Sequence, residues 1–209
     1  MSITAYQQAQ QQGQSAVRTA LLDIAKHLLV TEGPAALTVR RISAEAGCST
    51  KVIYTLFGGK DGLAEALWLE GFARLEQRLM RLPAESDLLS QLRAGLTAYR
   101  AHALAEPEYY RVMFLGALPG FVPGPETAAA AKRTLNMLID GVQICLDAGV
   151  LRGATAVELA EVLWMAMHGA VSLELSGFFV PAEGEQRYEL LCSSVLSPFL
   201  PTDERNRTL

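Results

Sequence analysis

Residues 38–60 read TVRRISAEAGCSTKVIYTLFGGK, and the fold of the chain is decided in this stretch. Thr38 precedes a short run with helical spacing, and Gly47 ends that run. Ser49 then begins a second short run, which the glycine pair at 58–59 breaks. A hydroxyl can accept a hydrogen bond at the start of a helix, and glycine takes the left-handed conformation that commonly ends one. The stretch therefore predicts two short helices joined by a tight turn.

A glycine-containing turn between two short helices is typical of a helix-turn-helix. In the second helix, Val52, Ile53, Phe57 and part of Leu56 are the expected core anchors. The other side chains are left for solvent or DNA, and lysine and hydroxyl groups can reach base edges or phosphates. These are Ser49, Thr50, Lys51, Tyr54 and Thr55. The alternative is an ordinary helical bundle with a solvated face, and spacing alone leaves both open.

Helical periodicity continues over nearly the whole chain. Apolar residues recur every three or four positions, and the breaks fall at Gly33-Pro34, Pro83, the segment LPGFVPGPE, Gly149 and Pro198. The sequence has no sustained alternation of apolar and polar residues, which would indicate strands, and no glycine-rich phosphate-binding loop. We expect an all-α fold with about nine helices, in which a compact N-terminal trio precedes a larger bundle.

Composition narrows the class of protein. The chain has 209 residues, of which 50% are apolar, and this is enough to form a core without disulfide or metal staples. Its three cysteines are widely spaced and form no metal-binding motif, which indicates a reduced chain without a metal site. The sequence has no apolar run of eighteen residues and its N-terminus does not read as a secretory signal. We therefore expect a cytoplasmic protein with no membrane partner and no cofactor.

Charge is distributed unevenly along the chain. The net charge is −4, which argues against a protein that coats nucleic acid with its whole surface. The first 63 residues carry a net charge of +2, and the remaining residues carry −6. A mildly basic head on an acidic body is compatible with a local contact to a polyanion.

The run TALLDIAKHLLVTEGPAALTVRRISAEAGCSTKVIYTLFGGKDGLAEAL resembles the DNA-binding domain of TetR-family transcriptional repressors. The run covers about fifty residues, and within it ten residues occupy the family's positions without a gap: Thr38, Ile42, Ala46, Gly47, Ser49, Tyr54, Phe57, Lys60, Asp61 and Leu63. Two positions depart from the family pattern. Cys48 stands where valine is usual, and Leu56 replaces a common aromatic, so a phosphate contact from that position is lost.

The resemblance implies roles for individual residues. Phosphates would be held by Thr38, Ser49, Tyr54 and Lys60. The side chains nearest the bases would be those of Thr50, Lys51 and Thr55. Arg40 would reach the DNA backbone or the neighbouring groove.

The resemblance also implies a domain organisation. We expect residues 1–14, MSITAYQQAQQQGQ, to be a disordered glutamine-rich tail. Residues 15–62 would be the DNA-binding domain, residues 63–200 a ligand-binding and dimerisation domain, and residues 201–209 a flexible tail. In the second domain, EPEYYRVMF and WMAMHG resemble a subtype with a Trp…His-Gly signature, here Trp164, His168 and Gly169.

Candidate pocket residues lie in the same region. Large apolar walls with a few polar tips are usual in small-ligand sites. The candidates are Tyr99, His102, Tyr109, Tyr110, Met113, Phe114, Trp164 and His168. Core packing is the alternative for the aromatic cluster. An interhelical hydrogen bond, or close packing at a dimer seam through Gly169, is the favoured alternative for His168.

The function that we expect is a homodimeric repressor that binds a palindromic operator in double-stranded DNA and is released by a small, largely apolar effector. The two heads would be spaced about one DNA turn apart, roughly 34–36 Å, or a multiple of it. The rival hypothesis is an α-helical ligand-binding or scaffold dimer without DNA binding. An enzyme is disfavoured, because no set of nucleophile, base and orienting group is evident.

Overall fold

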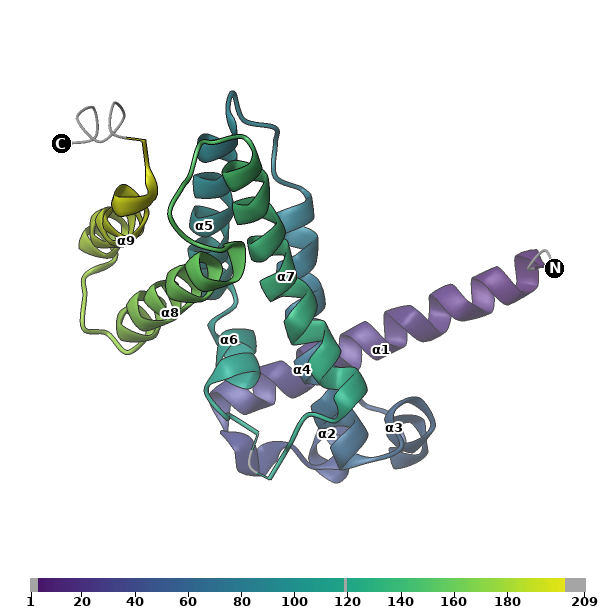
Figure 1. Cartoon of the computed structure of the whole chain (residues 1–209). Helices are drawn as coiled ribbons and strands as arrows, with labels where there is room; N and C mark the ends of the chain where they lie inside the picture. The colour runs from purple at the N-terminus through teal and green to yellow at the C-terminus, as the bar shows by residue number, and fades with distance from the viewer. Residues whose placement is uncertain (1–3, 119, 202–209) are drawn as a thin grey trace. The chain divides into compact units, whose positions relative to one another are not determined.

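The computed structural model describes residues 4–118 and 120–201, which form nine α-helices and two short 3-10 helices without a β-strand (Figure 1). This confirms the expected all-α fold. The elements in chain order are α1 (Ala5–Thr31), η1 (Pro34–Ala36), α2 (Val39–Glu45), α3 (Thr50–Phe57), α4 (Lys60–Met80), α5 (Leu88–Ala105), α6 (Pro107–Phe114), α7 (Pro125–Asp147), α8 (Ala156–Leu175), α9 (Pro181–Leu196) and η2 (Ser197–Phe199).

The N-terminal segment differs from its prediction. Residues 5–14 belong to α1, whereas the sequence predicted a disordered tail over residues 1–14. Thr4 caps this helix, because its hydroxyl accepts from the Gln7 amide while the Gln7 side chain accepts from the Thr4 amide. Glutamine and alanine are also good helix formers. Residues 1–3, and residues 202–209 of the predicted C-terminal tail, lie outside the part that the structure describes.

The chain forms two compact units. The first comprises residues up to Gly71 together with Glu108–Thr127, and the second comprises Phe72–Pro107 and the residues from Ala128 onward. The predicted boundary at 62/63 therefore differs from the observed division, which falls inside α4. The segment Glu108–Thr127 also joins the first unit, although the prediction assigned it to the second domain.

In the first unit, α1 packs against η1 and α2, and α2 packs against α3. The core is apolar, and Ile42 of α2 and Ile53 of α3 are completely buried. The guanidinium of Arg18 lies 5.0 Å from the centre of the Phe57 ring, a cation–π distance. These contacts fix the short helices against α1 and leave the opposite face of α3 open to solvent.

In the second unit, α8 packs against α5 and α9. By length and composition alone, α8 could cross a membrane, since its most apolar window has a mean hydropathy of 1.3. Two of its polar groups, however, are paired inside the unit: Glu174 bonds to Arg100 of α5, and His168 contacts Tyr99 of α5. Such pairing is the pattern of a helix packed in a protein core.

Candidate nucleic-acid interface

Local capping sets the start of α2 and the turn that follows it. The Thr38 hydroxyl accepts from the Arg41 amide at 3.1 Å, as its predicted capping role requires. Gly47 has a φ of +62° in the turn, a conformation that side chains with a Cβ rarely adopt. The Cys48 amide then donates to the Ser43 carbonyl at 3.0 Å. The turn between α2 and α3 is therefore fixed by its own backbone.

The ends of α3 also fall where the sequence predicted them. Ser49 occupies the N-cap position, but its hydroxyl accepts no capping hydrogen bond from the described part of the chain. Gly58 ends the helix with a φ of +73°, and α4 begins at Lys60. The Ser49 hydroxyl and the first amides of α3 therefore remain available for a phosphate oxygen.

All eight side chains that the sequence predicted to contact DNA are exposed on the first unit. They come from three consecutive elements and the caps before them: Thr38, Arg40, Ser49, Thr50, Lys51, Tyr54, Thr55 and Lys60. Tyr54 is 58% exposed, which is unusual for a ring of this size and leaves its face and hydroxyl accessible. By contrast, Ile53 and Phe57 are buried, and Val52 and Leu56 are half-buried.

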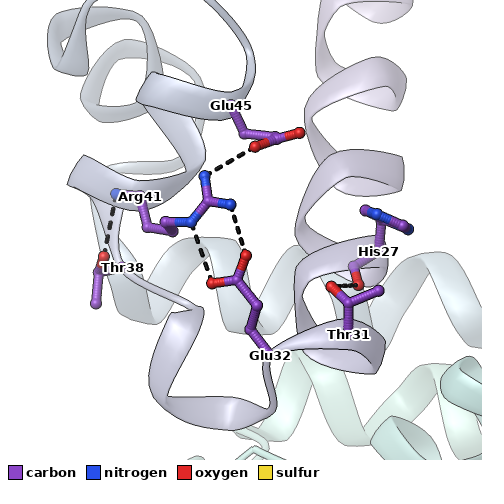
Figure 2. Close-up of polar contacts among 6 residues, drawn as sticks. All are labelled: His27, Thr31, Glu32, Thr38, Arg41 and Glu45. Atoms are coloured by element: carbon purple, nitrogen blue, oxygen red, sulfur yellow. Dashed lines mark hydrogen bonds and ion pairs between the residues drawn. The ribbon is translucent and has the colours of Figure 1, made fainter.

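Arg41, unlike its neighbour Arg40, is held in ion pairs. Figure 2 shows its guanidinium between two carboxylates, with Nη2 at 2.5 Å from Glu32 Oε1 and Nη1 at 2.8 Å from Glu45 Oε2. Hydrogen bonds from Arg41 lower the pKa of the Glu32 carboxyl below its ordinary value. The network ties the end of α1 to α2. The sequence analysis did not single it out, and the spacing of Arg41 and Glu45 was its only local signal.

Three of the predicted DNA-contacting side chains are cationic. Arg41 is paired with both Glu32 and Glu45, whereas Arg40 forms no ion pair with another described residue. Lys51 and Lys60 are also exposed. Arg40, Lys51 and Lys60 are thus exposed together with several hydroxyl groups on the first unit, which is compatible with the local polyanion contact considered from the charge distribution.

The predicted pocket residues fall into two sets. One set lies in the first unit, where Tyr109, Tyr110 and Met113 are buried and Phe114 is half-buried. The Tyr110 and Phe114 rings are 5.3 Å apart, and the Lys26 ammonium lies 5.0 Å from the Tyr109 ring centre. The structure places this set in the packing of the first unit.

The other set lies in the second unit and contains Tyr99, His102, Trp164 and His168. The Tyr99 hydroxyl is 3.0 Å from His168 Nδ1, and the Trp164 and His168 rings meet edge to face at 4.8 Å. Burial lowers the pKa of His168 to about 4, so the ring is neutral near pH 7. His168 therefore makes an interhelical contact, the alternative favoured from the sequence, and its part in binding a ligand stays a prediction.

His102 is 5% exposed, and its Nε2 has no hydrogen-bond partner among the residues described. Burial lowers the pKa of His102 to about 4, and the nearby Arg78 and Arg74 act in the same direction. A buried polar nitrogen without a partner is costly, which makes this atom a candidate for contact with a bound molecule.

The second unit also contains a buried ion pair. Arg100 donates through Nε to Glu174 Oε2 at 2.8 Å and through Nη2 to Glu174 Oε1 at 2.6 Å. The two side chains are only 10% and 6% exposed, and these hydrogen bonds raise the pKa of Arg100. The sequence indicated that Glu174 needs a partner if buried, but it did not identify Arg100.

Comparisons with known families agree with both units. A family model described as "Bacterial regulatory proteins, tetR family" matches residues 21–67. A second model, described as "Tetracyclin repressor-like, C-terminal domain", matches residues 92–195. The matches include the helix-turn-helix and most of the second unit. The Trp…His-Gly subtype stays a prediction.

Solved structures are similar over most of the chain. A protein of unknown function from Rhodococcus sp. RHA1 is 26% identical, with a TM-score of 0.77 over 88% of this chain and 95% of its own. The structure of SCO4313 is 25% identical, with a TM-score of 0.74 over 90% of this chain and 98% of its own. PfmR from Thermus thermophilus, a TetR family transcriptional regulator, shares the fold at 18% identity, with a TM-score of 0.66 over 84% and 96%. No curated protein matches the chain.

Proposed function

Because the chain belongs to the TetR family of DNA-binding transcriptional regulators, we propose that it is a homodimeric repressor that a small molecule releases from a palindromic operator. The observation that carries the proposal is the open face of α3, where Thr50, Lys51, Tyr54 and Thr55 are all exposed. Such a protein acts where the DNA is, so we place it in the cytoplasm.

The DNA contacts divide into two kinds. Lys60 at the start of α4, with the Tyr54 and Ser49 hydroxyls, is positioned to hold phosphates. A phosphate beside Lys60 also offsets the unfavourable meeting of its charge with the positive end of the α4 dipole. Lys51 and Thr55 lie one helical turn apart on α3, and they are the side chains we propose to read base edges.

The DNA-binding test uses three variants and a duplex selected from a random library by the wild-type protein. Lys60→Ala is expected to weaken binding and to reduce the slope of log K against log salt by about 0.9, because one phosphate contact is lost. Tyr54→Ala is expected to weaken binding with little change in slope. Lys132→Ala, an exposed lysine on α7, is the control. Wild-type binding by both head variants would reject the assigned site.

An exposed apolar surface on α8 and α9 supports the dimer. The exposed fractions of Val162, Met165 and Leu173 on α8 are 43%, 61% and 45%, and that of Leu190 on α9 is 67%. A Cβ built on Gly169, which lies on the same side of α8, would meet nothing within 4 Å. We propose that this surface pairs with its symmetry mate, because apolar patches of this kind mark interaction sites.

The dimer test introduces charge into the proposed seam. Met165→Glu and Leu190→Glu are expected to shift the sedimentation coefficient toward that of a monomer and to weaken operator binding. Val122→Glu is the control, because Val122 is 82% exposed and belongs to the first unit. If both seam variants sediment as the wild type does, α8 and α9 do not form the dimer contact.

Effector binding would act by a population shift. A ligand that binds better to a state with wrongly spaced heads lowers operator affinity without any chemistry. We place the ligand contact at Tyr99, His102, Trp164 and His168, supported by the unpartnered His102 nitrogen and the aromatic faces beside His168. The chain has two tryptophans, so Trp68→Phe leaves Trp164 as the single reporter. A compound that releases the operator should change Trp164 fluorescence in that variant, and an effector that leaves the emission unchanged would place the site elsewhere.

A further inference from the structure

The first helix is longer than the packing of the first unit requires. Every residue from Ala5 to Val17 is exposed, so the first three turns of α1 carry no buried anchor. Residues 5–17 are rich in glutamine and contain no charged side chain. The first basic residue of the chain is Arg18, and the first acidic residue is Asp23. A helical segment that buries no side chain gains little stability from packing. It is therefore available to contact another molecule.

The exposed turns of α1 form one wall of a groove, and α3 forms the other. Gln10, Gly13, Gln14 and Val17 line the α1 wall, and their spacing of three and four residues places them on one face of the helix. The groove holds about 420 Å³, far more than a packing gap of roughly one water volume, about 30 Å³.

The groove is lined by both apolar and hydrogen-bonding side chains. The apolar ones are Val17, Val52 and Leu56. The hydrogen-bonding ones are Gln10 and Gln14 of α1, Ser49 at the cap of α3, and Lys51 and Thr55 of α3. The lining contains one cation and no carboxylate. An anionic partner that also presents small apolar edges fits such a groove, whereas a cationic peptide would find no countercharge there.

We infer that this groove holds one strand of the operator DNA, and that Gln10 and Gln14 of α1 contact it from the side opposite the recognition helix. The inference rests on the proposed function, since the Lys51 side of α3 must face DNA. Glutamine amides can donate to phosphate oxygens or bond to base edges, and the apolar lining residues can contact sugars or thymine methyl groups. Gln10 and Gln14 are then DNA-positioning residues that lie outside the helix-turn-helix motif.

This contact has a signature that separates it from the lysine contacts. A neutral amide releases no counterion from DNA, so its loss lowers affinity without changing the salt dependence. Two hydrogen bonds, at a net value of about 0.5–1.5 kcal/mol each, correspond to an affinity loss of roughly five- to 150-fold.

The experiment compares two double variants of the full chain on a duplex selected from a random library by the wild-type protein. Gln10→Ala/Gln14→Ala removes the proposed contacts. Gln8→Ala/Gln12→Ala makes the same chemical change on the opposite side of α1, where both residues are also exposed. Circular dichroism checks that the two variants have equal helix content. The first variant is expected to bind at least fivefold more weakly with an unchanged salt slope, and the control is expected to bind as the wild type does.

Three outcomes would overturn the inference. Wild-type affinity in both double variants would mean that the groove does not contact DNA. Tighter binding by Gln10→Ala/Gln14→Ala would mean that α1 masks the recognition helix. Equal weakening in both would mean that helix content matters and the groove does not. The Lys60→Ala variant, tested beside them, separates these results from failure of the proposed function, because its loss of binding depends only on the helix-turn-helix.

Discussion

Gly62 of α4 lies directly against the carbonyl of Phe57, the last residue of α3, so that a Cβ on Gly62 would overlap the carbonyl oxygen. The backbone at the start of α4 can approach the end of α3 this closely only because position 62 has no side chain. Two proposed DNA-binding elements depend on this approach: the exposed face of α3, and Lys60 at the start of α4.

Replacing Gly62 should disturb the head through this contact. Gly62→Ala is expected to cost about 1–3 kcal/mol of unfolding free energy, because the added methyl group must displace backbone, and to weaken operator binding. Gly95→Ala is the matched control on α5, where a Cβ would meet nothing within 4 Å. That change is expected to stabilise by about 0.5–1 kcal/mol, because alanine suits a helix interior better than glycine. Urea unfolding at one fixed protein concentration measures both, and a neutral Gly62→Ala would contradict the contact.

Two neighbouring arginines should behave differently. Arg40 is exposed and forms no ion pair in the described structure, whereas Arg41 is held between Glu32 and Glu45. Arg40→Ala is expected to weaken operator binding and to lower the salt slope by about 0.9. Arg41→Ala is expected to lower the melting temperature, with the salt slope unchanged. Equal slopes for the wild type and Arg40→Ala would mean that Arg40 does not contact a phosphate.

The buried ion pair between Arg100 and Glu174 should contribute to the free energy of unfolding. Glu174→Gln is expected to destabilise by about 3–5 kcal/mol, because it leaves the Arg100 cation buried without a countercharge. Glu183→Gln breaks an exposed pair with Arg187 on α9 and should change stability by no more than about 1 kcal/mol. Urea unfolding of the two variants measures the difference. Similar small losses in both would show that solvent reaches Arg100.

The buried histidines predict a loss of stability in mild acid. The pKa of His102 is about 4 in the fold and 6.5 in a model peptide, so between these values the unfolded chain binds more protons. The resulting stabilisation is complete above about pH 6.5 and is lost as the pH falls toward 4. His102→Gln should therefore show a flatter decline of unfolding free energy than the wild type from pH 7 to 5. His27→Gln is the control, because His27 of α1 is exposed. Parallel curves for the wild type and His102→Gln would contradict the prediction.

The sequence predicted the helix-turn-helix well because its boundaries depend on local chemistry. Thr38, Gly47 and Gly58 act through hydrogen bonds and backbone angles within a few residues of themselves. The exposure of Ser49, Thr50, Lys51, Tyr54 and Thr55 followed from the same short-range periodicity, whereas Thr38, Arg40 and Lys60 were assigned by the family resemblance. Their contacts with DNA remain predictions.

Features that depend on distant residues were harder to predict. Glu174 needs a partner by its chemistry, but Arg100 lies 74 positions away and helical spacing does not select it. The pocket candidates at 109–114 were grouped with the second domain, because sequence order does not show that this segment packs with the first unit. The α1 extension was missed for a different reason: glutamine-rich composition is common in disordered chains, although the Thr4–Gln7 capping box favours a helix.

The Arg100–Glu174 pair also constrains how the protein can evolve. Gly184 of α9 lies against the Glu174 carboxylate, and the Arg100 cation lies 5.9 Å from the Tyr188 ring centre, so three helices meet at one pair of charges. An apolar replacement of both charged residues can be neutral or stabilising, but either single step strands a buried charge. Descendants of this chain should therefore keep both residues or lose both together, and that joint inheritance can be read in its relatives.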